Sequence, residues 1–217
     1  MNVSKLIPFR IITIVTALFI ASSNATSQAS LTLQGEILPS SCDITMDSSG
    51  KVQLGKMNTP NFSSEKKSIR LPERNIIVSI NCPAATLFGI RPMDIAINAG
   101  NVKHDGSGDN TVFSLGLTAS GQAIGGYYAS INKSLSSIDG KQPDNIIASR
   151  DQGNSWNLAQ GNLSAKGENV YSWGEQTQPH SARSVKVSLI ITPFLFKNNY
   201  SDTVNIEGLS SFELVYL

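Results

Sequence analysis

The sequence predicts an all-β domain, and two observations support this fold class. Apolar and polar residues alternate with a period of two in many short segments, whereas long stretches of helical periodicity do not occur. Turn-forming residues separate these segments, for example at residues 47–50 and at the dipeptides Gly125-Gly126 and Asp139-Gly140. A repeated succession of short strand and turn is typical of a β-sandwich or a β-barrel.

Seven segments with this alternation are expected to form strands. In chain order they are residues 31–37, 51–54, 76–80, 93–97, 112–117, 185–190 and 212–217. Residues 128–173 have a weaker pattern because Ser, Asn, Gln and Gly dominate there, so we expect short hairpins or a long loop inserted into the sandwich. No linker and no repeat of fixed period indicates a second domain.

The charge of the chain excludes one class of partner. The 217 residues include 17 Lys and Arg against 16 Asp and Glu, and only 15% of them are charged, compared with about 25% in ordinary soluble domains. Phosphate binding requires clustered basic side chains, and this sequence has no such cluster. We therefore expect no nucleic-acid partner.

Residues 1–25 have the features of a secretory signal peptide. Lys5 and Arg10 come before an apolar run at residues 11–21, and Ser23 and Ala25 supply the small residues that precede a cleavage site. The apolar run is shorter than the ~20 residues that a transmembrane helix needs. The sequence therefore predicts cleavage after Ala25 and export of the remaining chain.

The exported part contains two cysteines, Cys42 and Cys82. In an oxidising compartment, a single structural disulfide between them is the expected outcome. The two histidines, His104 and His180, stand in no metal-binding or catalytic motif. We expect no metal, no cofactor and no catalytic activity.

Residues 149–156 fit the S-x-D-x-G-x-x-W pattern of the Asp-box, a turn that recurs in sialidases and other propellers. In such a turn, Asp151 accepts backbone hydrogen bonds, Gly153 adopts a positive φ, and Trp156 packs under the hairpin. One copy does not make a propeller, which needs several similar blades. A structural hairpin is expected, with a glycan-contacting loop and a hydrolase as the alternatives.

Both ends of the exported chain are suited to strand pairing. The last six residues form an alternating strand in which Phe212, Leu214 and Tyr216 share one face. Near the other end, residues 26–34 form a short arm that also alternates. The apolar residues on one side of this arm are Ala29, Leu31 and Leu33. A strand of this kind either pairs in a sheet or remains an adhesive edge.

Four segments resemble the pilin subunits of the chaperone-usher pathway. The run at residues 31–42 is similar to the opening of those subunits, where an alternating arm precedes a glycine, an acidic residue and the first cysteine. Residues 51–55 resemble their next strand, residues 80–82 resemble the strand with the second cysteine, and residues 212–217 resemble their terminal strand. The chain looks most similar to a fimbrial-like subgroup with a long insertion.

This resemblance implies an incomplete immunoglobulin-like sandwich, spanning residues 35–217, that lacks its last strand. A groove would lie beside the terminal strand, lined by Phe212, Leu214 and Tyr216, and the carboxylate of Leu217 would anchor basic residues of a periplasmic chaperone. Residues 26–34 would serve as the donor strand for a neighbouring subunit during assembly at an outer-membrane usher. Such donor-strand exchange is a form of β-augmentation.

The resemblance therefore implies a structural subunit of a fimbria, or pilus, on the bacterial surface that contributes to cell adhesion. An adhesive or glycan-binding minor or tip subunit is the alternative, with residues 128–173 as the binding region. The candidate glycan-contacting residues are Trp156 and Trp173. A sialidase-like fragment is the enzyme alternative, based on the Asp-box.

Overall fold

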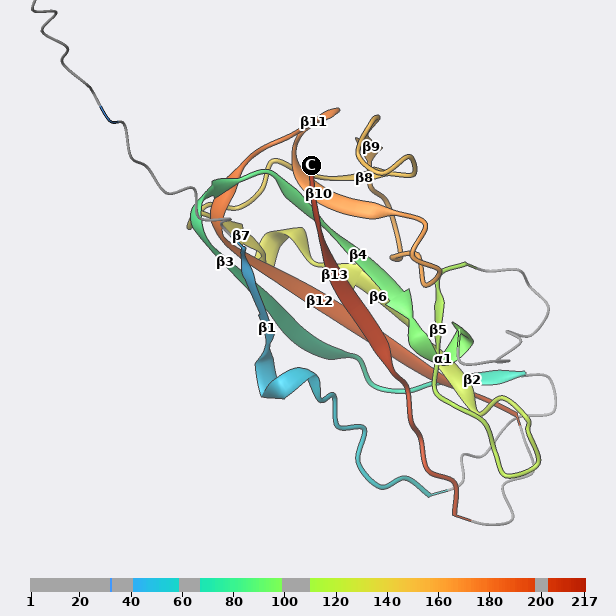
Figure 1. The fold of residues 1–217 in the computed structure, drawn as a ribbon. Helices are drawn as coiled ribbons and strands as arrows, with labels where there is room; N and C mark the ends of the chain where they lie inside the picture. Colours follow the sequence, from blue (N-terminus) through green and yellow to red (C-terminus); the bar gives the residue numbers. More distant parts are fainter. Residues whose placement is uncertain (1–31, 33–40, 59–66, 99–109, 198–202) are drawn as a thin grey trace, which may run out of the picture. The chain divides into compact units, whose positions relative to one another are not determined.

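The computed structural model describes residues 32, 41–58, 67–98, 110–197 and 203–217. Apart from Thr32, the expected signal segment and donor arm, with Ala29, Leu31 and Leu33, lie outside the described residues. The part from residue 41 onward is all-β and forms two antiparallel sheets (Figure 1). Its elements are β1 (Asp43–Met46), η1 (Asp47–Gly50), β2 (Ser68–Arg70), β3 (Arg74–Thr86), β4 (Phe88–Asp94), α1 (Ile95–Asn98), β5 (Val112–Ser114), β6 (Gly125–Ile131), η2 (Lys133–Leu135), β7 (Ser137–Ile138), β8 (Asn145–Ser149), β9 (Asn157–Leu158), β10 (Val170–Glu175), β11 (Gln178–Pro179), β12 (Ala182–Phe196) and β13 (Ser210–Tyr216).

The first sheet has the strand order β1-β3-β12-β6-β5. Its centre is β12, which has 15 residues and pairs with β3 on one side and with β6 on the other. The short strands β2 and β7 pair with the two ends of β12. Valine, isoleucine and leucine are frequent in β12 and in the first half of β3, which suits strands that are buried at the centre of a sheet.

The second sheet has the order β13-β4-β10-β8-β9, with β11 paired to β10. Strand β13 pairs with β4 along its whole length, from Ser210 opposite Asp94 to Tyr216 opposite Phe88. Because β1 and β13 come first in the two strand orders, each is an edge strand of its sheet (Figure 1).

The main core lies between the two sheets. Val78 and Val185 from the first sheet and Phe88 and Ile90 from the second belong to one buried cluster. The ring of Phe88 meets that of Trp173 edge to face, with 4.9 Å between the ring centroids. A disulfide joins Cys42 to Cys82 and ties the start of β1 to β3. The expected all-β class and the expected disulfide are therefore confirmed. Among the described residues, no helix is both long and apolar enough to cross a lipid bilayer.

Three of the expected strands are present at nearly the predicted positions. Residues 76–80 lie in β3, residues 185–190 lie in β12, and residues 212–216 lie in β13. The strand expected at residues 112–117 is present only over Val112–Ser114, as β5, and the one expected at residues 31–37 lies, apart from Thr32, outside the described residues. Two other expectations were wrong. Residues 51–54 form no strand, since Val52 and Leu54 pack against the core without a ladder partner among the described residues.

The strand expected at residues 93–97 ends at Asp94, and α1 follows. The carboxylate of Asp94 accepts a hydrogen bond from the backbone N–H of Ala96 at 2.9 Å, which turns the chain away from the sheet.

Residues 128–173 include a short hairpin, β8–β9, as one of the two alternatives expected, whereas the alternative of a long inserted loop was wrong. This part of the chain provides most of β6 in the first sheet, together with β8 and β10 in the second. Its strands carry serines at buried positions, among them Ser149 and Ser172, whose hydroxyl groups hydrogen-bond within the protein. Hydroxyl groups at buried positions reduce the apolar alternation that marks a strand in the sequence.

Candidate functional site

The two edge strands β1 and β13 form the candidate site. Within the described part of the chain, β1 pairs only with β3, and β13 pairs only with β4. Each strand therefore has one side whose backbone N–H and C=O groups have no ladder partner there. Unpaired edges of this kind are templates for the addition of another strand.

Apolar side chains from both edges reach the core between the sheets. Ile44 and Met46 extend from β1, and Phe212 and Leu214 extend from β13. All four are only partly buried, although they pack against the same main cluster. These half-buried apolar groups of β1 and β13, which a further element could cover, define what is called below the opening between the two strands.

The opening is bridged at one end by Tyr216. Its hydroxyl accepts a hydrogen bond of 2.8 Å from the backbone N–H of Cys42, so a side chain of one edge strand holds the start of the other. The disulfide between Cys42 and Cys82 also attaches Cys42 to β3. Tyr216 is 50% exposed, because the bridge lies at the surface.

The other end of β13 lies beside a buried polar group. The hydroxyl of Tyr127 donates to Oγ of Ser210 at 2.9 Å, which connects β6 in the first sheet with β13 in the second. Burial raises the pKa of Tyr127 to about 12, and the charge of Asp94 adds to this effect. Asp94 also accepts the backbone N–H of Ser114 at 2.5 Å. At Ser210 the strand β13 therefore meets a buried polar group, whereas Phe212 and Leu214 of the same strand meet the apolar core.

A small cavity of about 10 Å³ lies within the main core, lined mainly by apolar side chains, and Phe212 of β13 contributes to its wall. This volume is near the minimum that holds one water molecule. The cavity borders β13 at Phe212, whereas none of the residues that line it belongs to β1.

The structure describes every residue of the terminal strand that was expected to line the groove. Phe212 and Leu214 contact the core, and Tyr216 bridges to Cys42. Leu217 is 37% exposed, and its backbone N–H donates to the carbonyl of Leu87 at 3.1 Å.

Sequence reasoning missed the contribution of β1 to the opening. The order Asp43, Ile44, Thr45, Met46 alternates polar with apolar residues, and this alternation was the available signal.

The two tryptophans nominated for glycan contact are both buried. Trp156 is 6% exposed and Trp173 is 3% exposed. Nε1 of Trp156 donates to the carbonyl of Gly153 at 3.0 Å, whereas Nε1 of Trp173 has no hydrogen-bond partner among the described residues. Neither indole presents an exposed face to a sugar in this structure, because each ring packs inside a core cluster.

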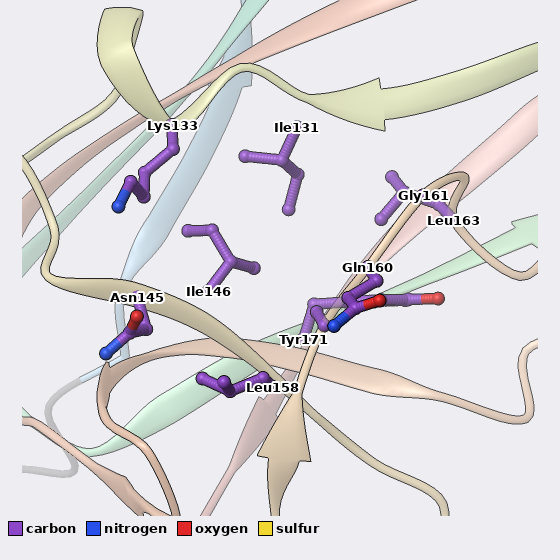
Figure 2. A pocket seen from close by; sticks show the side chains of 10 residues that line it. Ile131, Lys133, Asn145, Ile146, Leu158, Gln160, Gly161, Leu163 and Tyr171 are labelled. Carbon is purple, nitrogen blue, oxygen red and sulfur yellow. The ribbon is translucent and has the colours of Figure 1, made fainter.

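A second cavity, of about 250 Å³, lies between β6 of the first sheet and β8 of the second. Figure 2 shows Ile131, Ile146 and Leu163 pointing toward its centre, while Lys133 and Asn145 lie to one side. All of its lining residues fall within 131–171. The described residues contain no group of three or more His, Cys, Asp or Glu side chains that could hold a metal ion.

Comparison with known proteins identifies a family but no individual relative. No curated protein matches the chain. Residues 31–146 match the family described as "Protein of unknown function (DUF1120)", and this match covers more than half of the 217 residues. It includes strands β1 to β7 and the beginning of β8. This chain is therefore a member of the DUF1120 family.

Proposed function

We propose that this chain is a structural subunit of a chaperone-usher fimbria on the bacterial surface. In this proposal, subunits polymerise by donor-strand complementation, in which the N-terminal arm of one subunit adds a strand at the opening between β1 and β13 of the next. The observation that carries the proposal is the pair of facing edge strands, each with half-buried apolar side chains above a shared core.

The chemistry of the edges supports this form of assembly. An added strand gains main-chain hydrogen bonds along an unpaired edge, and its alternate side chains cover apolar groups. Each fully buried aliphatic or aromatic side chain contributes about 1.5–3 kcal/mol. Because the four edge residues are already half-buried, covering them would add roughly half of this amount for each, which is still a substantial part of the total stability of a domain, about 5–15 kcal/mol. A subunit without a partner strand would therefore have low stability.

The terminal motifs support the choice of partners. The arm at residues 26–34 alternates in the manner of a donor strand, and the opening beside β13 is the place where a chaperone strand would bind before assembly. The proposed partners are thus a periplasmic fimbrial chaperone, an outer-membrane usher and neighbouring subunits. The proposed location is a fimbria outside the cell, reached through the periplasm.

The test measures thermal unfolding of the purified protein with and without a synthetic peptide that copies residues 27–36. A ligand that binds only the folded state raises the melting temperature by mass action. We expect a low transition that rises with the peptide. A matched control peptide with Leu31→Asp and Leu33→Asp should have no effect, because charged groups cannot cover an apolar opening. A stable monomer that responds to neither peptide would contradict the proposal.

The cavity in Figure 2 favours a second candidate function, the binding of a glycan by an adhesive subunit. Its apolar centre can contact the C–H face of a sugar, and the amides of Asn145 and Gln160 can hydrogen-bond to hydroxyl groups. A glycan screen tests this candidate. Binding should be lost in Gln160→Ala and retained in Gln122→Ala, a control at an exposed residue outside the cavity. Absence of any glycan binding would remove it.

A further inference from the structure

The Asp-box turn at residues 149–156 is a compact hydrogen-bonded unit. Oγ of Ser149 donates to Oδ1 of Asp151 at 2.7 Å and accepts the backbone N–H of Gly153 at 2.7 Å. The Asp151 carboxylate accepts both the backbone N–H and the hydroxyl of Ser155, at 2.9 and 2.5 Å. These bonds hold the turn in one conformation independently of the rest of the sheet.

This turn follows β8, yet it contacts the edge strand β13. The order of the sheet is β13-β4-β10-β8, so two strands separate β8 from β13 (Figure 1). Trp156 forms a buried cluster with Ile147 of β8 and Val170 of β10, and Val215 of β13 packs against this cluster. The contact therefore crosses the outer face of the sheet.

A glycine makes room for this crossing. Gly89 on β4 stands directly opposite Val215 in the ladder. A Cβ atom at Gly89 would lie 2.5 Å from Cγ1 of Val170. Because Gly89 has no side chain, Val170 can cover β4 at a point beside Val215.

The turn contacts the end of the chain a second time, through Gly153. A Cβ atom at Gly153 would lie 2.6 Å from Cδ2 of Leu217, so the Leu217 side chain occupies the space that any larger residue at position 153 would need. The indole N–H of Trp156 donates to the carbonyl of Gly153, and this bond holds Gly153 in place beside the Leu217 side chain. Residues 215–217 are thus packed against the turn at two positions.

We propose that the Asp-box turn is a clamp that positions the end of β13, and that it thereby sets the affinity of the open edge for an added strand. The consequence for strand addition rests on the proposed function. An edge strand bonded on one side only is prone to local opening. Packing of Val215 and Leu217 on the outer face keeps Leu214 and Tyr216 in place on the inner face. A pre-organised edge loses less conformational entropy when a strand binds.

The test compares two glycine substitutions in the full-length protein. Gly153 and Gly161 both have φ in the left-handed region, at +98° and +72°, so Gly153→Ala and Gly161→Ala both introduce backbone strain. Only position 153 faces Leu217, because a Cβ atom at Gly161 would have no neighbour within 4 Å. The N–H of Leu217 donates to the carbonyl of Leu87, so in the antiparallel ladder the N–H of Val215 also faces β4, whereas those of Leu214 and Tyr216 face the open edge. Amide hydrogen exchange at Val215 and Leu217 should accelerate roughly tenfold more in Gly153→Ala than in Gly161→Ala.

A second pair of variants tests the clamp without altering the turn. Leu217→Ala removes the contact with Gly153, and Leu135→Ala removes a leucine that is 64% exposed elsewhere. Exchange at Val215 and at position 217 should increase in Leu217→Ala alone. The double variant Gly153→Ala with Leu217→Ala should exchange at the same rate as Leu217→Ala alone. Once Leu217 is shortened, the methyl group at position 153 no longer overlaps with its side chain.

Binding of the peptide that copies residues 27–36 provides the last measurement. A clamp that sets edge geometry predicts roughly tenfold weaker binding to Gly153→Ala than to Gly161→Ala. Equal exchange at Val215 and Leu217 in the two glycine variants, with no response to Leu217→Ala, would overturn the clamp. Failure of the peptide to bind the unaltered protein would instead overturn the proposed function, and the exchange data would still decide the clamp.

Discussion

Single hydroxyl groups satisfy backbone atoms inside this sandwich-like fold. Oγ of Ser172 donates to the carbonyl of Phe88 at 2.9 Å, across the boundary between β10 and β4. Oγ of Ser136 accepts the backbone N–H of Ser188 at 3.0 Å and donates to the carbonyl of Asn132 at 2.8 Å. Buried polar atoms are tolerated when they have partners, so these serines support the sheets from within.

The hydroxyl of Tyr216 gives a prediction for one bond. Tyr216→Phe removes the acceptor of the Cys42 N–H and leaves the ring in place. We expect the free energy of unfolding to fall by about 1 kcal/mol, the usual contribution of one hydrogen bond. Urea denaturation measures this change, and hydrogen exchange at the Cys42 amide should accelerate. An unchanged exchange rate at Cys42 would show that the bridge does not hold β1.

Asp151 gives a prediction for acidic pH. Hydrogen bonds from Ser155 and then Ser149 lower the pKa of this exposed carboxyl to about 2, from its ordinary 3.8. The folded state therefore binds the proton less readily than the unfolded state, and the resulting stabilisation is complete above about pH 4 and is lost as the pH falls toward 2. Asp151→Asn should melt below the unaltered protein at neutral pH, and the gap should narrow between pH 4 and pH 2. A gap that stays constant over this range would contradict this account of the turn.

At the scale of elements, glycines decide how closely strands approach. A Cβ atom at Gly126 in β6 would lie 2.5 Å from Cγ1 of Val112 in β5, and one at Gly89 in β4 would lie 2.8 Å from the carbonyl oxygen of Tyr171 in β10. At these two positions the available space, and not hydrophobicity, determines the residue, so the glycines interrupt the apolar alternation of β6 and β4.

Gly89→Ala tests this close approach. The added methyl group meets backbone as well as Val170, so it cannot be accommodated by a side-chain rotation alone. We expect destabilisation by about 1–3 kcal/mol, as in other overpacked sites. Chemical denaturation monitored by Trp fluorescence measures it, since Trp156 and Trp173 belong to the two core clusters that contact this sheet. A loss below about 0.5 kcal/mol, the usual scatter of neutral surface changes, would show that β4 can shift.

At the scale of the whole molecule, the disulfide joins the open edge to the core. Cys42 and Cys82 are 40 residues apart in sequence, so the cross-link restricts the unfolded chain. Replacing both cysteines with serine should lower the free energy of unfolding by about 4 kcal/mol. Equilibrium unfolding of the double variant measures this loss. Little or no loss would mean that the loop is already restricted in the unfolded chain.

The sequence by itself determined the local features of this protein. Alternation of apolar residues predicted β3, β12 and β13, because a strand buried on one face has a period of two whatever its partners are. Two cysteines in a chain that is expected to be exported predicted the disulfide. The S-x-D-x-G-x-x-W pattern predicted the turn at residues 149–156, because its hydrogen bonds are formed within that short segment.

Only the tertiary structure decided how these features combine. It placed β1 and β13 on the same side of the core, joined by the bond from Cys42 to Tyr216, although these residues are 174 positions apart. It also brought the Asp-box turn across two strands to Leu217. Strand order and edge contacts depend on long-range packing between sheets, and the period of a single segment carries no information about which other segment will cover it.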